Sequence, residues 1–406
     1  MKIIVIGGGA AGFFAAISAA QHHPQSQVIL LEKSSKLLAK VKISGGGRCN
    51  VTHACFDRKT LLTNYPRGQK ILRQALAQWM PQDTVQWFEK RGVPIKTEQD
   101  GRMFPTSDDS QSIIDCLIKT ARQLNIEILT QHEVTSLNKL ANGAFSLEIK
   151  HKDTQTADQV IITTGGSPKL RGFDWLAPMD LGIVPPVPSL FTFNLPRENI
   201  TQLPGIAVPK VQVKIPGTKL QEEGSLLVTH WGISAFAVLR LSAWGARILH
   251  DLDYKNPVIV NWLPDINEET LRNQVIDYQQ TLKNRQIPNR NPFALPNRLW
   301  EFFLRRWQIP AQKKWSELSK KERNRMINGL TNDTYQIEGK TTFKDEFVTC
   351  GGISLDEIDA KTMASKKHPG LYFAGEVLDI DGLTGGFNFQ AAWATGYVAG
   401  KLAYSA

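Results

Sequence analysis

The residues best suited to chemistry near the start of the chain are three glycines and a glutamate. Gly7, Gly9 and Gly12 have the spacing G-x-G-x-x-G, and Glu32 follows Gly12 by 20 residues. Glycines at this spacing allow a tight turn, a close approach of the backbone to a pyrophosphate, and close packing of a helix on a strand. A glutamate at this distance accepts hydrogen bonds from a ribose. The pattern predicts a site for the adenosine half of a dinucleotide.

Two strands and a helix must hold these residues in place. Residues 2–6 are an apolar run typical of a buried parallel strand, and the alanine-rich residues 10–21 predict a helix directly after the glycines. Residues 27–31 predict a second strand that ends at Glu32. The N-terminus of the helix offers unpaired N–H groups and the positive end of its dipole to phosphates. An ordinary glycine turn would not account for Glu32, so we interpret the segment as a nucleotide-binding βαβ unit.

Further glycine clusters occur elsewhere in the chain. Residues 44–50 are Ser-Gly-Gly-Gly-Arg-Cys-Asn, in which the glycines permit close approach to a ligand and the arginine can bind a phosphate. Residues 159–163 predict a buried strand that leads to Thr164 and Gly165, and residues 370–376 predict another. Strand ends of this kind lie at the ligand-binding edge of an open α/β sheet. A flexible surface loop is the alternative explanation for residues 44–50.

The composition restricts the class of protein. The chain has 406 residues, a hydrophobic fraction of 42%, and a net charge of +10 from 48 basic and 38 acidic residues. Four cysteines in so long a chain exclude a disulfide scaffold and suit a reducing compartment. No apolar stretch approaches the roughly 20 residues of a membrane span, and residues 2–6 are too short for the core of a signal peptide. The spacing of Cys, His and carboxylates indicates no metal site. We therefore predict a cytoplasmic protein with no metal and no membrane contact, whose charge suits an acidic partner.

A proline-rich stretch near residue 188 separates segments of different composition. Before it the chain alternates strands and helices, whereas after it short alternating runs with Pro and Gly turns predict antiparallel strands. The last segment returns to the order strand, glycine turn and helix. The expected fold class is therefore α/β, with a split Rossmann-like nucleotide-binding domain in residues 1–188 and 346–406. Residues 189–345 are expected to form an inserted β-rich substrate domain that includes a helical basic subdomain at about 265–330.

Residues 283–325 concentrate the positive charge. This segment carries twelve basic and three acidic residues, which leaves a net charge of +9, and several aromatic residues lie between the cations. Lys and Arg favour phosphate binding, and unpaired bases stack on aromatic side chains. The ordinary alternative is a solvated helical face whose long side chains cover a core. The predicted RNA contacts are Arg298, Arg305, Arg306, Trp307, Lys313 and Lys314.

Taken together, these motifs resemble those of one flavoprotein family. The segments that carry the resemblance are 7–12, 44–50, 164–166, 229–230, 349–353 and 373–388. They are similar to the BaiN/RdsA family of NAD(P)/FAD-dependent oxidoreductases, the YhiN-like flavoproteins, and above all to its ribosomal RNA dihydrouridine synthase branch. The resemblance covers the chain from end to end. It implies a glutathione-reductase-like FAD-binding domain, a bound FAD, and reduction of an activated carbon–carbon double bond.

The resemblance also implies which residues hold FAD. The adenosine diphosphate half would contact Gly7, Gly9, Gly12 and Glu32, and the flavin half Arg48, Gly375, Glu376, Asp381, Gly386 and Asn388. The remaining predicted contacts are Ala11, Lys33, Lys40, Gly46, Gly47, Cys49, Asn50, Val134, Thr164, Gly165, Gly385 and Gln390. One departure is visible, because Ala235 stands where the family pattern has a second glycine, directly after Ser234.

Reduction of a double bond needs a hydride from the flavin and a proton for the neighbouring carbon. Cys49 and His230 are the predicted proton donors, and Cys350 is a further candidate. The ordinary alternatives are thiols that only pack and a histidine that is hydrogen-bonded for structural reasons. A second dinucleotide motif is missing, so NAD(P)H is expected to act as a transient reductant at the flavin.

The basic segment and the resemblance favour a uridine of large-subunit ribosomal RNA as the substrate, reduced to dihydrouridine. A second hypothesis is an NAD(P)H-dependent reductase of a small-molecule enone similar to a bile-acid intermediate, which would not need the basic segment. A third is an RNA-binding or assembly protein that keeps FAD as a structural ligand. Retained FAD without reduction by NAD(P)H would support the third hypothesis.

Overall fold

The chain divides into two compact units. The computed structural model describes residues 1–341 and 348–402. The first unit comprises Met1–Ser189 and Phe343–Ala406, and the inserted unit comprises Leu190–Thr342. The predicted boundary after residue 188 lies one residue from the observed one. The predicted boundary after residue 345 lies outside the described residues.

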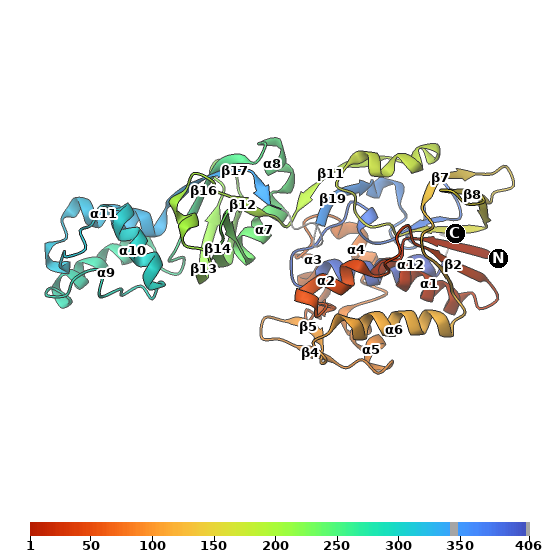
Figure 1. Cartoon of the computed structure of the whole chain (residues 1–406), viewed down its shortest axis with the longest axis horizontal. Helices are drawn as coiled ribbons and strands as arrows, with labels where there is room; N and C mark the ends of the chain where they lie inside the picture. Colours follow the sequence, from red (N-terminus) through yellow and green to blue (C-terminus); the bar gives the residue numbers. More distant parts are fainter. Residues whose placement is uncertain (342–347, 403–406) are drawn as a thin grey trace. The chain divides into compact units, whose positions relative to one another are not determined.

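A five-stranded parallel sheet forms the centre of the first unit, which also contains both chain ends (Figure 1). In spatial order its strands are β20 (Leu371–Phe373), β10 (Gln159–Ile162), β1 (Lys2–Ile6), β2 (Gln27–Leu31) and β6 (Glu127–Leu129). Ile3, Ile4 and Val5 have no exposed surface, as expected of a strand covered on both faces. Because β1 and β20 come from opposite ends of the chain, the predicted α/β fold with a split nucleotide-binding domain is confirmed.

Helices α1 (Ala10–His22) and α12 (Phe387–Gly400) pack against each other beside this sheet (Figure 1). Phe14 of α1 lies in an aromatic cluster, with its ring centroid 4.8 Å from that of Trp87 and 4.7 Å from that of Trp393. Such aromatic pairs add to the stabilisation from buried area. The other helices of the unit are α2 (Ala39–Gly47), α3 (Arg58–Leu62), α4 (Gln69–Ala75), α5 (Pro81–Glu89), α6 (Ser110–Gln123) and the 3-10 helices η1 (Leu170–Met179), η4 (Leu355–Glu357) and η5 (Gly375–Val377).

Three small antiparallel sheets complete the first unit. They are β3-β5-β4 (Thr52–His53, Arg102–Pro105, Ile95–Thr97), β7-β8-β9 (Val134–Lys139, Phe145–Ile149, Gln155–Ala157) and β11-β19 (Ile183–Ser189, Val348–Ile353). β11 brings the chain to the inserted unit and β19 follows the return, so this two-stranded sheet ties together the two parts of the split unit. The β11 prolines that mark the composition change therefore lie in a paired strand.

The inserted unit contains a seven-stranded antiparallel sheet. In spatial order its strands are β17 (Asp333–Glu338), β16 (Lys255–Asn261), β13 (Ala207–Lys214), β14 (Gln221–Val228), β15 (Gly232–Ser234), β12 (Thr192–Asn194) and β18 (Lys340–Thr341). The 3-10 helix η2 (Asn199–Gln202) lies between β12 and β13 in the chain. Helix α7 (Phe236–Trp244) packs on β14, and Gly245 separates it from α8 (Ala246–Asp251).

A helical subdomain lies between β16 and β17. It contains α9 (Glu268–Thr281), α10 (Asn297–Arg306), the 3-10 helix η3 (Trp315–Glu317) and α11 (Lys320–Thr331). Its core is aromatic, since Trp300 and Trp315 have no exposed surface. The subdomain therefore has a packed aromatic core, and the long cationic side chains of this segment lie around it.

Candidate cofactor-binding site

The glycine turn between β1 and α1 is held by close backbone packing. Gly7 has a φ of +115°, which favours glycine, and its N–H donates to the Leu31 carbonyl oxygen at 2.7 Å. A Cβ on Gly12 would lie 1.9 Å from the Gly7 carbonyl oxygen, so helix and turn meet without room for a side chain. The Thr163 hydroxyl donates to the Gly7 carbonyl oxygen at 3.0 Å. The N-terminus of α1 is therefore fixed at the ends of β1 and β10.

Glu32 lies at the end of β2, beside this turn. Its carboxylate accepts from the Gly8 N–H at 2.9 Å and from the Ser34 N–H at 2.8 Å. The His132 N–H donates to the Glu32 carbonyl oxygen at 2.9 Å, which brings the start of β7, with Val134, to the same strand end. Glu32 and Val134, two of the predicted cofactor contacts, therefore lie near each other although they are distant in the sequence.

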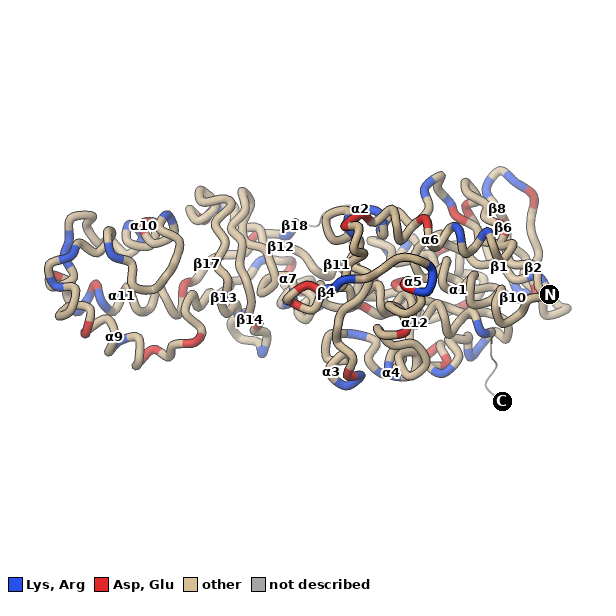
Figure 2. Tube along the Cα trace, turned by 90° about the horizontal axis from the view of Figure 1, so that it is seen from below, with Lys and Arg blue, Asp and Glu red and all other residues tan. Residues whose placement is uncertain are grey.

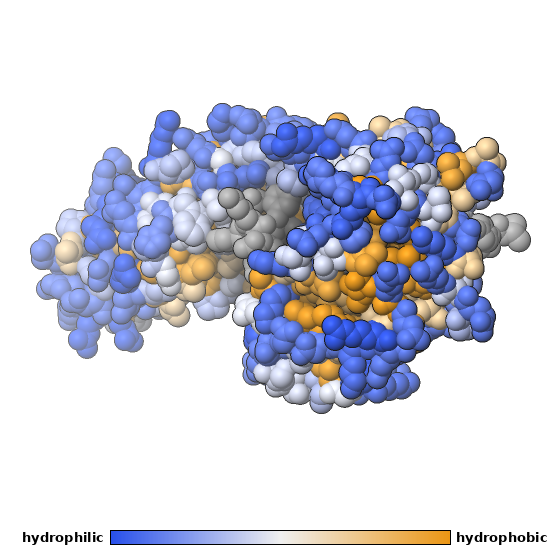
Figure 3. Space-filling model, turned by 45° about the vertical axis from the view of Figure 1, so that its right-hand side comes forward, coloured by the Kyte–Doolittle hydropathy of each residue, from blue (hydrophilic) through white to orange (hydrophobic). Residues whose placement is uncertain are grey.

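Four of the predicted glycines border open space. A Cβ on Gly9, Gly46, Gly47 or Gly165 would have no described protein atom within 4 Å. On the face of the first unit that Figure 3 shows, hydrophobic residues gather in a hollow between hydrophilic surfaces. Backbone that faces open space beside a helix N-terminus, together with Glu32 and an apolar surface, fits a dinucleotide with an aromatic ring system.

Lys40 and Glu376 connect two of the predicted segments. The Lys40 ammonium donates to a Glu376 carboxylate oxygen at 2.7 Å, and the other Glu376 oxygen accepts from the Thr349 N–H at 3.0 Å. A Cβ on Gly166 would meet this carboxylate at 2.6 Å. The end of β10, the start of η5 and helix α2 therefore converge. The contacts of Thr164, Gly165, Gly375 and Lys40 with the cofactor stay predictions.

Several predicted contacts use their side chains to hold the protein itself. The Arg48 guanidinium donates to Glu98 at 2.6 Å and lies 3.9 Å from the Phe104 ring centroid. The hydrogen bond to Glu98 raises the pKa of Arg48. The Asn388 amide both accepts from the Gly382 N–H at 2.8 Å and donates to the Gly382 carbonyl oxygen at 2.9 Å. The predicted contacts of Arg48 and Asn388 with the flavin stay predictions.

The same holds for three buried polar side chains. Asp381 has no exposed surface and forms an ion pair with Arg67, and Gln390 has none either and is bonded within the core. Asn50 is 8% exposed, and its amide, suitably oriented, donates to the Thr52 carbonyl oxygen and accepts from the Gly386 N–H, each at 3.0 Å. Of the three side chains, that of Asn50 holds the turn at Gly386. The predicted contacts of all three residues with the cofactor stay predictions.

Cys49 is also a supporting residue. Its thiol has no exposed surface, and burial raises its pKa to about 12. Its backbone has a φ of +63°, two residues after Gly47. A thiol that neither reaches the surface nor releases its proton readily is a poor acid. The prediction that Cys49 donates the proton is therefore corrected, and Cys350, which is equally buried, is no better placed.

His230 belongs to the inserted unit and is exposed, between β14 and β15. Five residues further on, Ala235 has φ 77° and ψ −171°, a conformation that is essentially restricted to glycine. This is the position at which the sequence departs from the glycine of the family pattern. Because alanine stands here instead of glycine, the backbone at the start of α7 is strained. This strain costs on the order of 1–3 kcal/mol.

Burial divides the predicted RNA contacts. Trp307 is 5% exposed and stacks on Phe303 with ring centroids 5.1 Å apart, so it has no face to offer to a base. The Lys313 ammonium lies 2.6 Å from Glu322. Arg306 lies 3.4 Å from Asp333 and donates to the Thr334 carbonyl oxygen. Trp307 is therefore a core residue, and Lys313 and Arg306 both bond to other parts of the protein. Their predicted contacts with RNA stay predictions.

The remaining cations of residues 283–325 are available at the surface. Within the described chain, eight of them are exposed and form neither an ion pair nor a side-chain hydrogen bond. They are Lys283, Arg285, Arg290, Arg298, Arg305, Lys314, Lys320 and Lys321. We call them the open cations. They include Arg298, Arg305 and Lys314 from the predicted contacts.

The sequence patterns did not identify Arg67 and Leu38, which form hydrogen bonds with residues of the site. Arg67 donates to Asp381 at 2.5 Å and reaches Ser189 as well, but no motif surrounds it in the sequence. Leu38 has a left-handed φ of 54°, and its N–H donates to the Gly8 carbonyl oxygen at 2.9 Å. Thr163 was detectable, since it directly precedes the Thr164–Gly165 motif at the end of a predicted strand.

This arrangement matches a known protein family. The model of the HI0933-like protein Rossmann domain matches residues 1–402. The chain belongs to this family. It is an FAD-dependent oxidoreductase, in agreement with the glycine turn, Glu32 and the open backbone around them. When bound, FAD supplies the hydride chemistry, while the chain's own residues bind it, orient it and shield it from water.

Curated relatives span most of the chain. One named ribosomal RNA dihydrouridine synthase from Escherichia coli K12 is 32% identical over 374 residues, which cover 89% of this chain and 88% of the relative. One with the same name from Haemophilus influenzae is 28% identical over 379 residues, covering 90% of each chain. A relative named 3-dehydro-bile acid delta(4,6)-reductase from Clostridium scindens is 29% identical over 386 residues, covering 92% of this chain and 91% of the relative.

Solved structures share the fold at low identity. The 3-ketosteroid-delta4-(5alpha)-dehydrogenase from Rhodococcus jostii RHA1 has a TM-score of 0.52 and 13% identity, covering 98% of this chain and 97% of that chain. The 3-ketosteroid delta1-dehydrogenase from Sterolibacterium denitrificans has a TM-score of 0.50 and 12% identity, covering 98% of each chain.

Two further features are missing from the described residues. Residues 1–341 and 348–402 contain no helix that is long and apolar enough to cross a membrane. The same residues contain no group of three or more His, Cys, Asp or Glu side chains placed to hold a metal ion.

Proposed function

We propose that this protein reduces a uridine of large-subunit ribosomal RNA to dihydrouridine in the cytoplasm, with FAD as cofactor and NAD(P)H as reductant. The observation that carries the proposal is the set of open cations in the inserted unit of a chain whose relatives include two named ribosomal RNA dihydrouridine synthases. In the reaction, the C5=C6 bond of uracil takes a hydride at one carbon and a proton at the other.

The open cations support an RNA substrate because, within the described chain, they are exposed and bind no other side chain. Figure 2 shows that Lys and Arg outnumber the acidic residues along α10 and α11, whereas α9 carries mainly acidic residues. The Trp315 N–H donates to the Arg285 carbonyl oxygen at 3.0 Å, so the segment with Lys283 and Arg285 lies beside the one with Lys314. Cations brought together from separate segments fit a phosphate backbone.

The proton donor is part of the proposal. With Cys49 buried, His230 remains the candidate from the sequence, and its exposed side chain is free to face a substrate. A His230→Ala variant is expected to bind FAD normally, to be reduced by NADPH at the normal rate, and to form dihydrouridine at least about tenfold more slowly. If it forms dihydrouridine at the unaltered rate, water or another group supplies the proton.

The direct experiment supplies FAD-loaded protein with NADPH and unmodified large-subunit ribosomal RNA. Digestion and mass spectrometry are expected to reveal a uridine that has gained two hydrogens. NADPH oxidation without dihydrouridine would refute the RNA substrate, and retained FAD that NAD(P)H does not reduce would favour a protein with structural FAD.

The RNA surface is tested by removing open cations while keeping those that form ion pairs. The surface variant carries Arg285→Gln, Arg298→Gln, Arg305→Gln and Lys314→Gln. The control variant removes the same charge from the first unit through Lys59→Gln, Lys70→Gln, Lys90→Gln and Lys119→Gln. If each of the four open cations neutralises one phosphate, the surface variant should reduce the log–log salt slope of RNA binding by about 3. Equal RNA affinity and equal slopes for both variants would contradict the proposed surface.

A small-molecule substrate is the second candidate. The relative named 3-dehydro-bile acid delta(4,6)-reductase, 29% identical over 386 residues, favours an activated double bond in a compact apolar compound. In that case the surface variant would keep full activity on a steroid enone, and neither variant would act on RNA. Comparing both substrates with the same two variants separates the candidates.

A further inference from the structure

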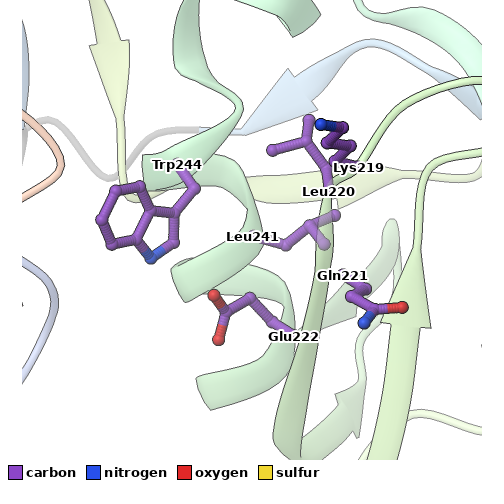
Figure 4. A pocket seen from close by; sticks show the side chains of 6 residues that line it. All are labelled: Lys219, Leu220, Gln221, Glu222, Leu241 and Trp244. Carbon is purple, nitrogen blue, oxygen red and sulfur yellow. The ribbon is translucent and has the colours of Figure 1, made fainter. Parts of the chain in front are cut away.

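The inserted unit contains a small pocket whose lining residues are not among the predicted cofactor contacts. It has a volume of about 200 Å³ and is lined by Lys219, Leu220, Gln221, Glu222, Leu241 and Trp244 (Figure 4). It lies where the end of α7 meets the turn between β13 and β14. Pockets for whole drug-sized ligands start at roughly 300 Å³, so this one suits a single flat ring system.

Glu222 is unusual for its position in the sheet. Side chains of a strand alternate between faces, so Glu222 shares a face with Leu226 and Val228, which are 0% and 1% exposed. A Cβ on Gly224, which lies between them on this face, would meet the start of α7 at 3.1 Å. The side chain of Glu222 therefore lies on the helix-covered side of the sheet, where it is partly buried.

This carboxylate has no partner in the described part of the chain. No hydrogen bond or ion pair reaches it, although burial raises the pKa of Glu222 and only the charge of Arg240 opposes that shift. Partial removal of a carboxylate from water costs free energy unless N–H donors replace the lost hydration. The neighbouring Glu223 on the opposite face differs, since it is exposed and accepts from Gln212 at 3.3 Å.

Trp244 provides the second element of the pocket. Its indole is partly exposed at the end of α7, and Glu222 extends toward the same side in Figure 4. Leu241 is fully buried and Leu220 partly, which gives the pocket an apolar wall. Lys219, at the rim, is exposed. An aromatic face, an unpartnered carboxylate and a rim cation are the groups that bind the ring, the edge and the phosphate of a nucleotide.

We propose that this pocket binds a guanine base of the RNA substrate, stacked on Trp244 with its Watson–Crick edge against Glu222. Among the four bases, guanine presents two adjacent donors on that edge, its N1–H and its amino group. Adenine and cytosine place an acceptor beside their amino group, and uracil offers only one donor, so a carboxylate disfavours all three. This inference rests on the proposed RNA function, which it extends to recognition of a base other than the one reduced.

The test measures binding of nucleotides to the full-length, FAD-loaded protein by titration calorimetry. GMP is expected to bind at least about tenfold more tightly than IMP, which lacks the amino group, and than AMP, CMP or UMP. Glu222→Gln should abolish this preference, because an amide offers one acceptor in place of two. The matched control Glu223→Gln should keep it. Trp244→Ala should weaken all nucleotides together.

Folding is controlled by FAD content and by the thermal unfolding midpoint of each variant. The proposal is overturned if wild-type protein shows no preference for GMP, or if Glu222→Gln keeps the preference. It is also overturned if N-acetyl-arginine amide binds in place of GMP and depends on Glu222, since the pocket would then receive an arginine of a protein partner. These titrations involve no reduction, so their outcome is independent of the activity assay. The protein can form dihydrouridine without preferring GMP, and it can prefer GMP without forming dihydrouridine.

Discussion

Replacing Gly9 with alanine should weaken FAD binding without unfolding the protein. Gly9 has φ −91° and ψ −170°, which alanine adopts freely, and its added Cβ would meet no described atom within 4 Å. At the start of a helix glycine is somewhat better than alanine, while alanine lowers the entropy of the unfolded chain. These effects oppose each other, so the free energy of unfolding should change by less than about 1 kcal/mol.

The added methyl group would occupy the space through which the backbone approaches the pyrophosphate. We expect the Kd for FAD to rise at least about tenfold, which corresponds to about 1.4 kcal/mol. Gly12→Ala is the matched comparison. Its Cβ would lie 1.9 Å from the Gly7 carbonyl oxygen, and the turn must open by at least 1.1 Å to reach a tolerable 3.0 Å. Overpacking of this kind costs roughly 1–3 kcal/mol or more.

The assay uses deflavinated protein, with FAD titration followed by quenching of flavin fluorescence and with unfolding followed by circular dichroism. Gly9→Ala should change only the Kd, and Gly12→Ala both the Kd and the unfolding midpoint. FAD binding by Gly9→Ala that equals the wild type would refute the placement of the pyrophosphate. A loss of apoprotein stability in Gly9→Ala as large as in Gly12→Ala would refute the argument from open space.

Three further predictions concern the stability of one unit or the other. Arg67→Met leaves the buried Asp381 carboxylate without its cation and should lower the free energy of unfolding by about 3–5 kcal/mol, measured in urea. Adding Asp381→Asn should recover part of this loss. A loss below about 1 kcal/mol would contradict the buried pair. Burial raises the pKa of Glu322 in the helical subdomain, but hydrogen bonds from Lys313 and Ser319 outweigh this effect and hold that pKa at about 2. The stability that ionised Glu322 contributes is complete above pH 4.5 and is lost as the pH falls toward 2. Lys313→Gln should therefore move the midpoint of acid unfolding to higher pH. An unchanged midpoint would count against the ion pair. Ala235→Gly should relieve the strained backbone and stabilise the protein by about 1–2 kcal/mol, whereas a destabilised variant would show that no strain is stored there.

The cofactor fold was predictable because its signals are local. Gly7, Gly12 and Glu32 belong to one βαβ unit whose spacing is dictated by the geometry of a turn, a helix and a strand. Gly9 lies in the same unit and borders open space, and its contact with the pyrophosphate stays a prediction. The parallel sheet that joins the two ends of the chain follows from the strand and glycine pattern near Gly375.

Side-chain roles were harder to predict because they depend on partners that are distant in sequence. Arg48 has the chemistry to bind a phosphate, but Glu98 and Asp108 occupy its guanidinium. Asp381 is paired with Arg67, which lies 314 residues earlier. A motif specifies which residues gather at a site. How many hydrogen bonds each side chain can still form with a ligand depends on its partners in the complete fold.

The basic segment illustrates the same limit. Its charge is evident from composition, but a count of cations does not separate Lys313, which stabilises a helix end through Glu322, from Lys314, which is exposed. Trp307 resembles a stacking residue in sequence and is a core residue in the fold. Alternation of charged and aromatic residues is common to RNA-binding surfaces and to amphipathic helices that cover a core.

The most direct test of the proposed function is mass spectrometry of large-subunit ribosomal RNA from cells that lack this protein. We predict that one dihydrouridine reverts to uridine, that wild-type protein restores it, and that the surface variant with four open cations replaced does not. Ribosomal RNA whose dihydrouridine content is identical with and without the protein would contradict the proposed function.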